Sequence, residues 1–486
     1  MDSHASGENE RNSPRRNILT RIWMYDILVG ESNKGIQGGV CSNAGSVSLF
    51  LGNRASEGGL SVEVLAGIVF ILMYVVIVSE KIHRTVAAVL GALVMLYAGV
   101  LSMDSALHHV DFNTLGLLVG MMVLVGVTSQ TGLFDYVAIW AAQKAKAEPR
   151  RILIYLGLIT AVFSGFLDNV TTVLLMVPVT FSITSKLHLS PMPFLLTQII
   201  ASNIGGTATL IGDPPNIMIG SAAPELTFLA FIENLAPIAF FNLFIVIFLM
   251  EVIYRKQLKT QPELQQEVLA LDAKKSLKDR RLLAKSLFVL ALTILGFFTH
   301  GITHIESALI ALGGGFLLLL LAGGSHHLVE KTMKSVEWAT IFFFIGLFIA
   351  VGGLVETGVI HDLAVKAIEL TGGDVTATSL LVLWLSALVS SVLDNIPFVA
   401  TMIPLIQSMG QMGVANLDPI WWSLALGACL GGNGTLVGAS ANLIVAGLAA
   451  ERGVKITFLR YLWVGFPIML LTIVLSTIYV YLRYLL

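Results

Sequence analysis

The stretch SGFLDNVTTVLLMVPVT, residues 164–180, places an aspartate and an asparagine in the middle of an otherwise apolar run. Two threonines follow Asp168 and Asn169, and Pro178 lies further along the same run. A carboxylate at the centre of a membrane helix costs about 2.5–3.5 kcal/mol on insertion scales. An aspartate in such a position therefore needs a specific role.

The composition is that of a polytopic membrane protein. Of 486 residues, 56% are hydrophobic and 12% are charged, and the mean hydropathy is +0.83. These values exclude a water-soluble globular protein. Apolar runs of roughly 17–25 residues, enough to cross the hydrocarbon as helices, recur along the chain. We expect an all-α fold with about 10 transmembrane helices, near residues 62–79, 85–101, 112–130, 194–220, 237–254, 286–300, 304–322, 338–355, 421–448 and 461–482.

Two segments are polar instead. Residues 1–60 are mixed in charge and lack a sustained apolar period, so we expect a disordered N-terminal tail. No apolar stretch follows Arg15 and Arg16, which argues against a signal peptide. Residues 255–285 are rich in charge, and we expect a partly helical cytoplasmic linker. The net charge of −2 indicates no particular partner, and the two cysteines indicate neither a disulfide framework nor a metal site.

The chain contains an internal duplication. Three pairs of similar segments are separated by the same 226 positions without gaps. The pairs are residues 110–132 and 336–358, residues 164–178 and 390–404, and residues 205–218 and 431–444. One shared offset for three separate motifs indicates two homologous units joined by the charged linker.

The repeat also predicts the topology. We expect re-entrant hairpins at residues 151–183 and 375–409, because a polar break leaves two apolar arms of about 15 residues, each short for a crossing. Each unit, residues 61–254 and residues 286–486, then has five crossings and one hairpin. Because five is odd, the second unit enters the membrane from the opposite side, and the repeat is inverted. Most Lys and Arg residues fall on one face, which the positive-inside rule makes cytoplasmic. The same count places the tail, despite its basic residues, on the other face.

The segment NIGGTATLIGDPPNIMIGS, residues 203–221, interrupts an apolar span. Its glycines permit unwinding, and Pro214 and Pro215 remove two amide donors. Non-helical backbone survives at membrane depth only where protein or a water-filled cavity satisfies it. We therefore expect broken helices at residues 194–220 and 421–448, whose free carbonyls and half-helix ends bind ions. The second copy reads ASA in place of DPP, so the two half-sites differ chemically.

Asp168 and Asp394 occupy matching hairpin tips, and each is followed by Asn. An Asp-Asn pair can cap the second arm of a hairpin, but Ser or Asn would do so without a carboxylate. Intramembrane carboxylates usually serve ion or proton pathways, so we favour binding of H⁺ or Na⁺. The predicted ion and substrate site consists of Asp168, Asn169, Thr171, Thr172, Asn203, Gly205, Gly206, Thr207, Gly212, Asp213, Pro214, Pro215, Asn216, Asp394, Asn395, Gly432, Asn433, Thr435 and Asn442.

Other polar residues are weaker candidates. Glu356 lies at the end of a span, where a solvated or capping role is the simpler interpretation. Two His pairs, His108 with His109 and His326 with His327, lie in polar loops. No third ligand stands at a useful spacing from either pair, so we expect no metal site.

At the motifs FLDNVTT, NIGGTATLIGDPPN, SSVLDNIPF and GACLGGNGTLVGASAN, the sequence resembles the ion transporter superfamily. This superfamily includes arsenite permeases of the ArsB type, NhaD-type sodium/proton antiporters, divalent anion/sodium symporters and the melanosomal P protein. The resemblance is closest to the P protein branch and spans about residues 62–482.

The resemblance implies two re-entrant hairpins and two unwound helices around a midplane site, a homodimer, and an elevator-like movement of the transport domain. In sodium/dicarboxylate relatives the hairpin tips read Ser-Asn-Thr and bind sodium together with the carboxylates of the substrate. Here the matching tips begin with Asp168 and Asp394. An added carboxylate disfavours a dianion unless it is protonated or paired with a cation, which argues against a citrate or succinate carrier.

We therefore expect a secondary active transporter in the lipid bilayer, of a cell or an organelle, that is coupled to H⁺ or Na⁺. Its expected substrate is a small inorganic or organic anion or oxyanion, with arsenite as the first to test. A Na⁺/H⁺ antiporter is the alternative, because two carboxylates could exchange two ions without a third substrate.

Two further classes are remote alternatives. A channel can share this architecture. An intramembrane aspartyl protease of presenilin type requires Gly-x-Gly before its second Asp, and LIGD, residues 210–213, lacks that pattern. The sequence has no Gly-rich ATP-binding loop, so any ATP-driven pumping would need a separate ATPase subunit. We expect no enzymatic activity, no nucleic-acid partner and no cofactor beyond the coupling ion.

Overall fold

The computed structural model describes residues 61–79 and 81–486, and these residues form helices joined by short connections, without a β-strand. They belong to one compact unit, Gly58–Leu486. The expected tail, residues 1–60, lies outside the described residues. The predicted all-α fold class is confirmed.

The helices of the first repeat follow the expected apolar runs. They are α3 (Val62–Ser79), α4 (Arg84–Tyr97), α5 (Met103–His109), α6 (Phe112–Ser129), α7 (Leu133–Lys144), α8 (Pro149–Leu167), α9 (Asn169–Lys186), α10 (Met192–Thr207), α11 (Pro214–Ala222) and α12 (Phe228–Tyr254). The segment 255–285 contains α13 (Pro262–Leu269) and the short 3₁₀ helix η1 (Ala273–Ser276).

The second repeat has the same order of long helices, hairpin and broken helix. Its elements are α14 (Arg280–Thr303), α15 (Ser307–Leu321), α16 (His326–Ser335), α17 (Trp338–Glu356), α18 (Val359–Thr371), α19 (Val375–Val392), α20 (Asn395–Gln411), α21 (Asp418–Gly431), α22 (Ser440–Glu451), α23 (Phe458–Val480) and the π-helical turn η2 (Tyr481–Leu485). Eight helices in the described residues are long and apolar enough to cross a membrane, so the chain is a multi-pass integral membrane protein.

The hairpin arms are longer than the expected 15 residues or so. Helix α8 has 19 residues and α9 has 18, while α19 has 18 and α20 has 17. The apolar run alone underestimates the arms, because the polar residues at the hairpin base, such as Arg150 and Lys186, are helical too. Each second arm nevertheless begins directly after its aspartate, Asp168 or Asp394, and the first arms end at Leu167 and Val392.

Helices α10 and α21 form the core of their repeats. Every residue of α10 is buried, as are all residues of α21 from Pro419 to Gly431. Helix α10 packs against α8, α9 and α12, and α21 packs against α19, α20 and α23. A helix that is apolar all round is stable only inside a bundle, so these two broken helices lie where a site is shielded from lipid.

A second group of helices packs through small residues. Helix α6 lies on α15, and α4 lies on α17. A Cβ atom at Gly120 would stand 2.3 Å from the carbonyl carbon of Ala311, and one at Gly346 would stand 2.6 Å from that of Ala88. Such close backbone approach requires glycine and is typical of membrane helix pairs. We call α3, α4, α6, α15 and α17 the scaffold group.

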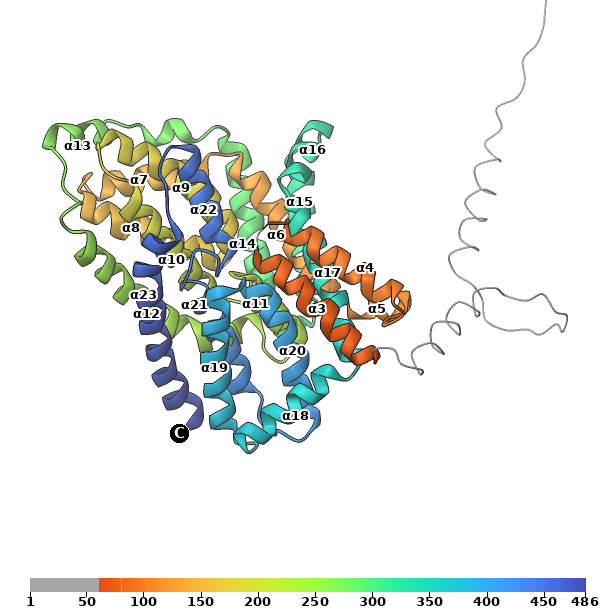
Figure 1. Cartoon of the computed structure of the whole chain (residues 1–486). Helices are drawn as coiled ribbons and strands as arrows, with labels where there is room; N and C mark the ends of the chain where they lie inside the picture. The colour runs from red at the N-terminus through yellow and green to blue at the C-terminus, as the bar shows by residue number, and fades with distance from the viewer. Residues whose placement is uncertain (1–60, 80) are drawn as a thin grey trace, which may run out of the picture. The chain divides into compact units, whose positions relative to one another are not determined.

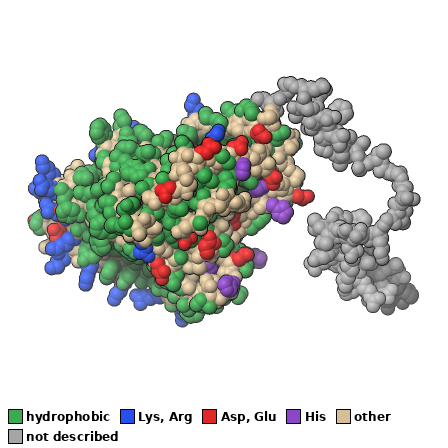
Figure 2. Space-filling model, turned by 90° about the horizontal axis from the view of Figure 1, so that it is seen from below, with side chains coloured by type: hydrophobic (Ala, Val, Ile, Leu, Met, Phe, Trp, Pro, Cys, Tyr) green, Lys and Arg blue, Asp and Glu red, His purple; other side chains and the backbone are tan. Residues whose placement is uncertain are grey.

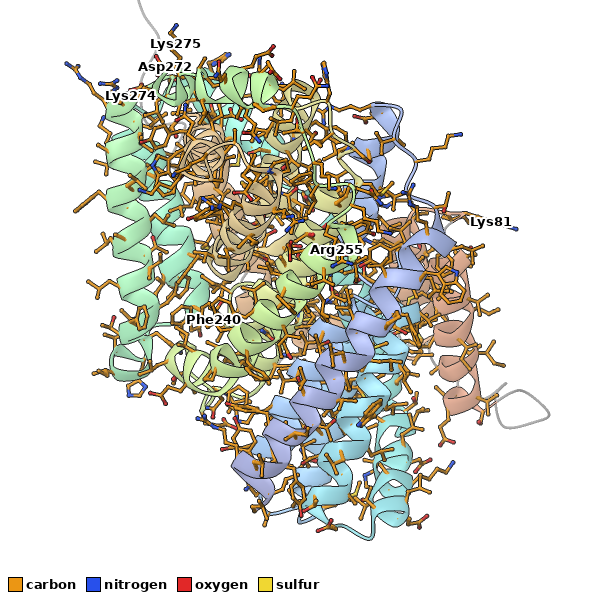
Figure 3. All side chains as sticks on the ribbon, turned by 90° about the vertical axis from the view of Figure 1, so that its left-hand side faces the viewer. Lys81, Phe240, Arg255, Asp272, Lys274 and Lys275 are labelled. Atoms are coloured by element: carbon orange, nitrogen blue, oxygen red, sulfur yellow. The ribbon has the colours of Figure 1, made fainter. Side chains whose placement is uncertain are left out.

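Charge differs between the two ends of this unit. Helices α13 and α16 lie at one end, and α18 and the chain end lie at the other (Figure 1). Asp272, Lys274 and Lys275 project from the α13 end (Figure 3). Seen from the α18 end, Asp, Glu and His side chains are scattered over one side of a largely hydrophobic and uncharged face, and Lys and Arg gather mainly along the opposite edge (Figure 2). This distribution is consistent with the expectation that the α13 end is cytoplasmic.

The orientation of the hairpins can be tested by labelling single cysteines in a protein with Cys41 and Cys429 replaced by serine. Ser185 and Gln411 are exposed near the hairpin bases, whereas Gly413 has a φ of 102° that strains any other residue. Because the repeat is inverted, we expect an impermeant thiol reagent outside intact cells to label Gln411→Cys and not Ser185→Cys. Equal labelling of both from the same side would contradict the inverted repeat.

Candidate functional site

The first hairpin turns at a single residue, Asp168, with φ 98° and ψ 156°. Its carboxylate accepts hydrogen bonds from the backbone N–H and from the hydroxyl of Thr171, each at 2.7 Å. Asp168 therefore caps α9, as the structural interpretation of this residue predicts. However, the side chain is buried, and a positive φ is unfavourable for aspartate by roughly 1–3 kcal/mol. Capping alone does not require such a conformation.

The second tip has different partners. Asp394 accepts a hydrogen bond from the Ile396 N–H at 3.3 Å and caps α20 without a positive φ. Its Oδ2 accepts hydrogen bonds from Nη1 of Arg84 at 2.5 Å and from the hydroxyl of Ser440 at 2.7 Å. Within residues 61–79 and 81–486, no Lys, Arg or His forms an ion pair with Asp168. The two tips thus carry carboxylates in different electrostatic states.

An asparagine holds each helix break. The unwound segments are residues 208–213 and 432–439. Nδ2 of Asn216 donates to the carbonyl of Thr209 in the first break at 2.9 Å and to the last two carbonyls of α10 at 3.2 and 3.4 Å. Nδ2 of Asn442 donates to two carbonyls of the second break at 2.8 and 2.9 Å. These two amides replace helical hydrogen bonds that the breaks lack.

Each hairpin is joined to its neighbouring broken helix by hydroxyl-to-carbonyl hydrogen bonds that repeat at the offset of 226. They run from Ser164 to Ser202, from Ser390 to Ala428, from Thr209 to Gly165 and from Thr435 to Ser391. The duplication seen in the sequence therefore extends to the interactions that position the tips.

Buried amides from both repeats meet near the tips. Asn203 accepts from Asn169 at 3.3 Å and donates to Oδ1 of Asn433 and of Asn442 at 3.0 Å each. The first break also faces the second tip, because the Asp213 carboxylate accepts hydrogen bonds from Nδ2 of Asn395 at 3.3 Å. The site is consequently a composite of the two repeats.

A cavity of about 30 Å³ lies where the tips and the first break meet. A cavity needs roughly 10–15 Å³ of this volume to hold one water molecule, so it has room for an ion or very few water molecules. It is lined by Arg84, Leu118, Met122, Asp168, Asn169, Val170, Asp213, Pro214, Glu337, Thr340, Asn395, Ile396 and Ser440. Five of these residues belong to the predicted site.

Two larger cavities lie at opposite ends of α17. The first, about 590 Å³, reaches Asp394 and is lined by residues 336–340 at the start of α17. The second, about 280 Å³, is lined by residues 348–355 towards the other end of that helix. Val110 and Asp111 of the second cavity match Val336 and Glu337 of the first at the offset of 226. The repeat therefore places related cavities towards the two ends of α17.

Sequence reasoning missed four polar residues that line the small cavity: Arg84, Glu337, Thr340 and Ser440. Arg84 was interpreted only as a marker of the cytoplasmic face. Glu337 matches Asp111 in the repeated motif, so the alignment of the two repeats could have indicated it. Nothing in the sequence places Arg84 beside Asp394, which is 310 positions away.

The other predicted site residues lie around the small cavity and not in its wall. The glycines allow close backbone approach: a Cβ at Gly205 would stand 2.1 Å from the Ala161 carbonyl oxygen, and one at Gly206 would stand 2.6 Å from that of Gly212. The remaining residues are buried or support the tips and breaks: Thr171, Thr172, Thr207, Pro215, Asn216, Gly432, Asn433, Thr435 and Asn442. Among the described polar atoms, the Thr172 hydroxyl and Nδ2 of Asn433 are buried without a partner.

The weaker candidates lie away from the small cavity. Glu356 accepts hydrogen bonds from Ser105 at 2.7 Å and pairs with His109 at 3.2 Å. His108 and His109 line the cavity of about 280 Å³. Among the described residues, no group of three or more His, Cys, Asp or Glu side chains is placed to hold a metal ion.

The close contact at Gly205 gives a stability prediction. We expect Gly205→Ala to lower the free energy of unfolding by about 1–3 kcal/mol, because the added methyl group meets the backbone of α8. Gly313→Ala is the matched control, since nothing lies within 4 Å of its Cβ position. Thermal unfolding of both variants in detergent measures the difference. An equal melting temperature for the two variants would contradict the packing of α10 on α8.

Comparison with protein families places this fold among transporters. A model of a family described as citrate transporter matches residues 74–427. An uncharacterized transporter of Mycobacterium tuberculosis is 42% identical over 427 residues, which cover 87% of this chain and 98% of the relative. The human P protein is 34% identical over 546 residues, which cover 95% of this chain and 65% of that protein.

A solved structure shares the fold. The YdaH transporter of Alcanivorax borkumensis, described as having an unusual topology, superposes with a TM-score of 0.53. The match covers 87% of this chain and 99% of that chain at 15% sequence identity. Similarity at this level concerns the arrangement of helices and not the substrate.

Proposed function

The chain belongs to the citrate transporter family, and we propose that it is a secondary active transporter that moves a small solute by alternating access, coupled to H⁺ or Na⁺. Transport across a membrane follows from the family and from the membrane-spanning helices. We propose the coupling ion, the substrate and the transport mechanism in addition.

The small cavity at the tips, together with larger cavities towards both ends of α17, is the observation that carries the proposal. The cavity of about 30 Å³ shares four lining residues with the cavity of about 590 Å³, and a further cavity of about 280 Å³ lies towards the other end of α17. A channel would need a continuous path, whereas a carrier exposes one site to each side in turn. The inverted repeat supplies two related halves, and each half can adopt the conformation of the other. The site would then be open to one side of the membrane before this exchange and to the other side after it.

The coupling ion binds at the carboxylates of the tips in this proposal. Asp168 offers carboxylate oxygens beside the Thr171 hydroxyl and has no basic partner among the described ion pairs. Buried carboxylates are unfavourable unless a cation or a proton neutralises them. A bound H⁺ or Na⁺ therefore stabilises the buried carboxylates by neutralising them. The same ion is carried across the membrane in the transport step.

The charge of the site constrains the solute. Asp168, Asp213 and Glu337 line the small cavity and Asp394 adjoins it, while Arg84 is the single basic residue in its described wall. An uncharged hydroxylated solute such as arsenious acid meets less repulsion there than a multiply charged anion. The family description names citrate, which would need cations to offset its charge. We therefore propose arsenite as the first substrate to test, with citrate in parallel.

Neutral substitutions at the two tips test the coupling. We expect Asp168→Asn and Asp394→Asn to insert and fold but to reduce gradient-driven uptake into proteoliposomes about tenfold or more, because Asn keeps a capping oxygen and loses the titratable charge. Glu356→Gln, away from the small cavity, is the matched control. Wild-type uptake by both tip variants would exclude the carboxylate role, and failure of one alone would show that the tips carry different ions.

A Na⁺/H⁺ antiporter is the second candidate, and the size of the small cavity favours it. A volume of about 30 Å³ fits an ion without an organic solute. Proteoliposomes with a pH-sensitive dye separate the two functions. Addition of Na⁺ alone should move protons if the protein is an antiporter. An H⁺-coupled carrier should move protons only when arsenite or citrate is added, and a Na⁺-coupled carrier should not move them.

A further inference from the structure

Arg84 occupies an unusual position for an arginine in an apolar helix. It is the first residue of α4, and its Nη1 lies 2.5 Å from Oδ2 of Asp394 and 2.5 Å from the hydroxyl oxygen of Ser440. Its Cζ lies 5.0 Å from the ring centroid of Phe343 on α17. The side chains of Arg84 and Asp394 are 25% and 11% exposed. One guanidinium thus joins a carboxylate, a hydroxyl and an aromatic face at a partly buried position.

The partners of Arg84 belong to two different groups of helices. Arg84 and Phe343 come from α4 and α17 of the scaffold group, which pack on each other. Asp394 comes from the second hairpin tip, and Ser440 is the first residue of the half-helix α22. The ion pair therefore ties the second tip and the second break to the scaffold group.

The guanidinium also separates two cavities. Arg84, Glu337, Thr340 and Ser440 line both the cavity of about 590 Å³ and the central cavity of about 30 Å³. Asp394 lines the larger one. A solute that moves between the two cavities passes the four residues that they share, and Arg84 has the longest side chain among them. His83 and Tyr74 are the other titratable groups that line the larger cavity.

We propose that Arg84 is a built-in competitor for the cation that binds Asp394, and that its ion pair with Asp394 is the gate between the large cavity and the central cavity. A monovalent cation or a proton that takes the carboxylate removes the partner of Arg84. The guanidinium then leaves, the passage opens, and the tip is released from the scaffold group. This inference rests on the proposed ion coupling and adds the residue that links ion binding to opening.

The asymmetry of the repeat supports this role. Position 310, which matches Arg84 at the offset of 226, is Ile, and position 214, which matches Ser440, is Pro. The first tip consequently has neither partner, and an ion can bind Asp168 without displacing a basic side chain. Breaking a buried pair by removal of one partner leaves an unpaired charge that attracts water or ions. Loss of Arg84 should therefore hydrate the gate.

Cysteine accessibility tests the gate without a transport measurement. Leu118, in the wall of the central cavity, and Val78, in the wall of the large cavity, are replaced singly by cysteine in a protein with Cys41 and Cys429 changed to serine. We expect Arg84→Ala to raise the rate at which a small charged thiol reagent modifies Leu118→Cys by about tenfold. The rate at Val78→Cys should stay within about twofold, because that side chain is already exposed.

Three further variants make the test specific. Asp394→Asn should raise the Leu118→Cys rate as Arg84→Ala does, and the double variant should add nothing, because both remove one interaction. Arg84→Lys should give a smaller increase than Arg84→Ala, since its ammonium group keeps a positive charge that can pair with Asp394. Arg452→Ala is the matched control: its Cζ lies 4.7 Å from the Phe181 ring centroid, and no carboxylate pairs with it among the described ion pairs.

The outcomes separate this inference from the proposed function. An unchanged Leu118→Cys rate in Arg84→Ala, or an equal rise at Val78→Cys, would overturn the gate. Additive effects of Arg84→Ala and Asp394→Asn would overturn the ion pair as its basis. If Na⁺ or low pH accelerates the Leu118→Cys reaction in the parent protein and not in Arg84→Ala, competition for Asp394 is supported even when uptake of arsenite and citrate is absent.

Discussion

Hydrogen bonding of unwound backbone within a membrane protein is the constraint on which this structure depends. Lipid offers no donors or acceptors, so each carbonyl freed by a helix break needs a partner from the protein. Asn216 and Asn442 supply those partners within their own breaks, and hydroxyls such as Thr209 and Thr435 tie the breaks to the hairpins. Unwound backbone within the membrane is stable because these side chains form hydrogen bonds with it.

The same constraint produces a polar centre in an apolar fold. The amide cluster around Asn203 joins the first tip to the second break, and the contact of Asp213 with Asn395 joins the first break to the second tip. Carboxylates placed on this frame are buried without being unsatisfied. The two halves are alike in their frame and unlike in their ion pairing, because Arg84 pairs with Asp394 while no basic side chain pairs with Asp168 among the described ion pairs.

The sequence predicted those features that local pattern and repetition determine. The offset of 226 located both tips and both breaks, and burial of charge indicated Asp168 and Asp394. It underestimated the hairpin arms, because residues such as Arg150 are polar and still helical. It also missed Arg84, because pairing across 310 positions depends on how the fold brings the second tip to the start of α4 and not on any local pattern. Predictions from single residues were weakest where function depends on contacts between the repeats.

Access to one central residue from the two sides in turn is the most direct test of this account. A single cysteine at Ile396, a buried residue in the wall of the cavity of about 30 Å³, reports on that access in oriented membrane vesicles. We predict that an impermeant thiol reagent modifies it from either side, and that a change of Na⁺ or pH which speeds the reaction from one side slows it from the other. Reaction from one side alone under all ion conditions, or acceleration from both sides together, would contradict alternating access.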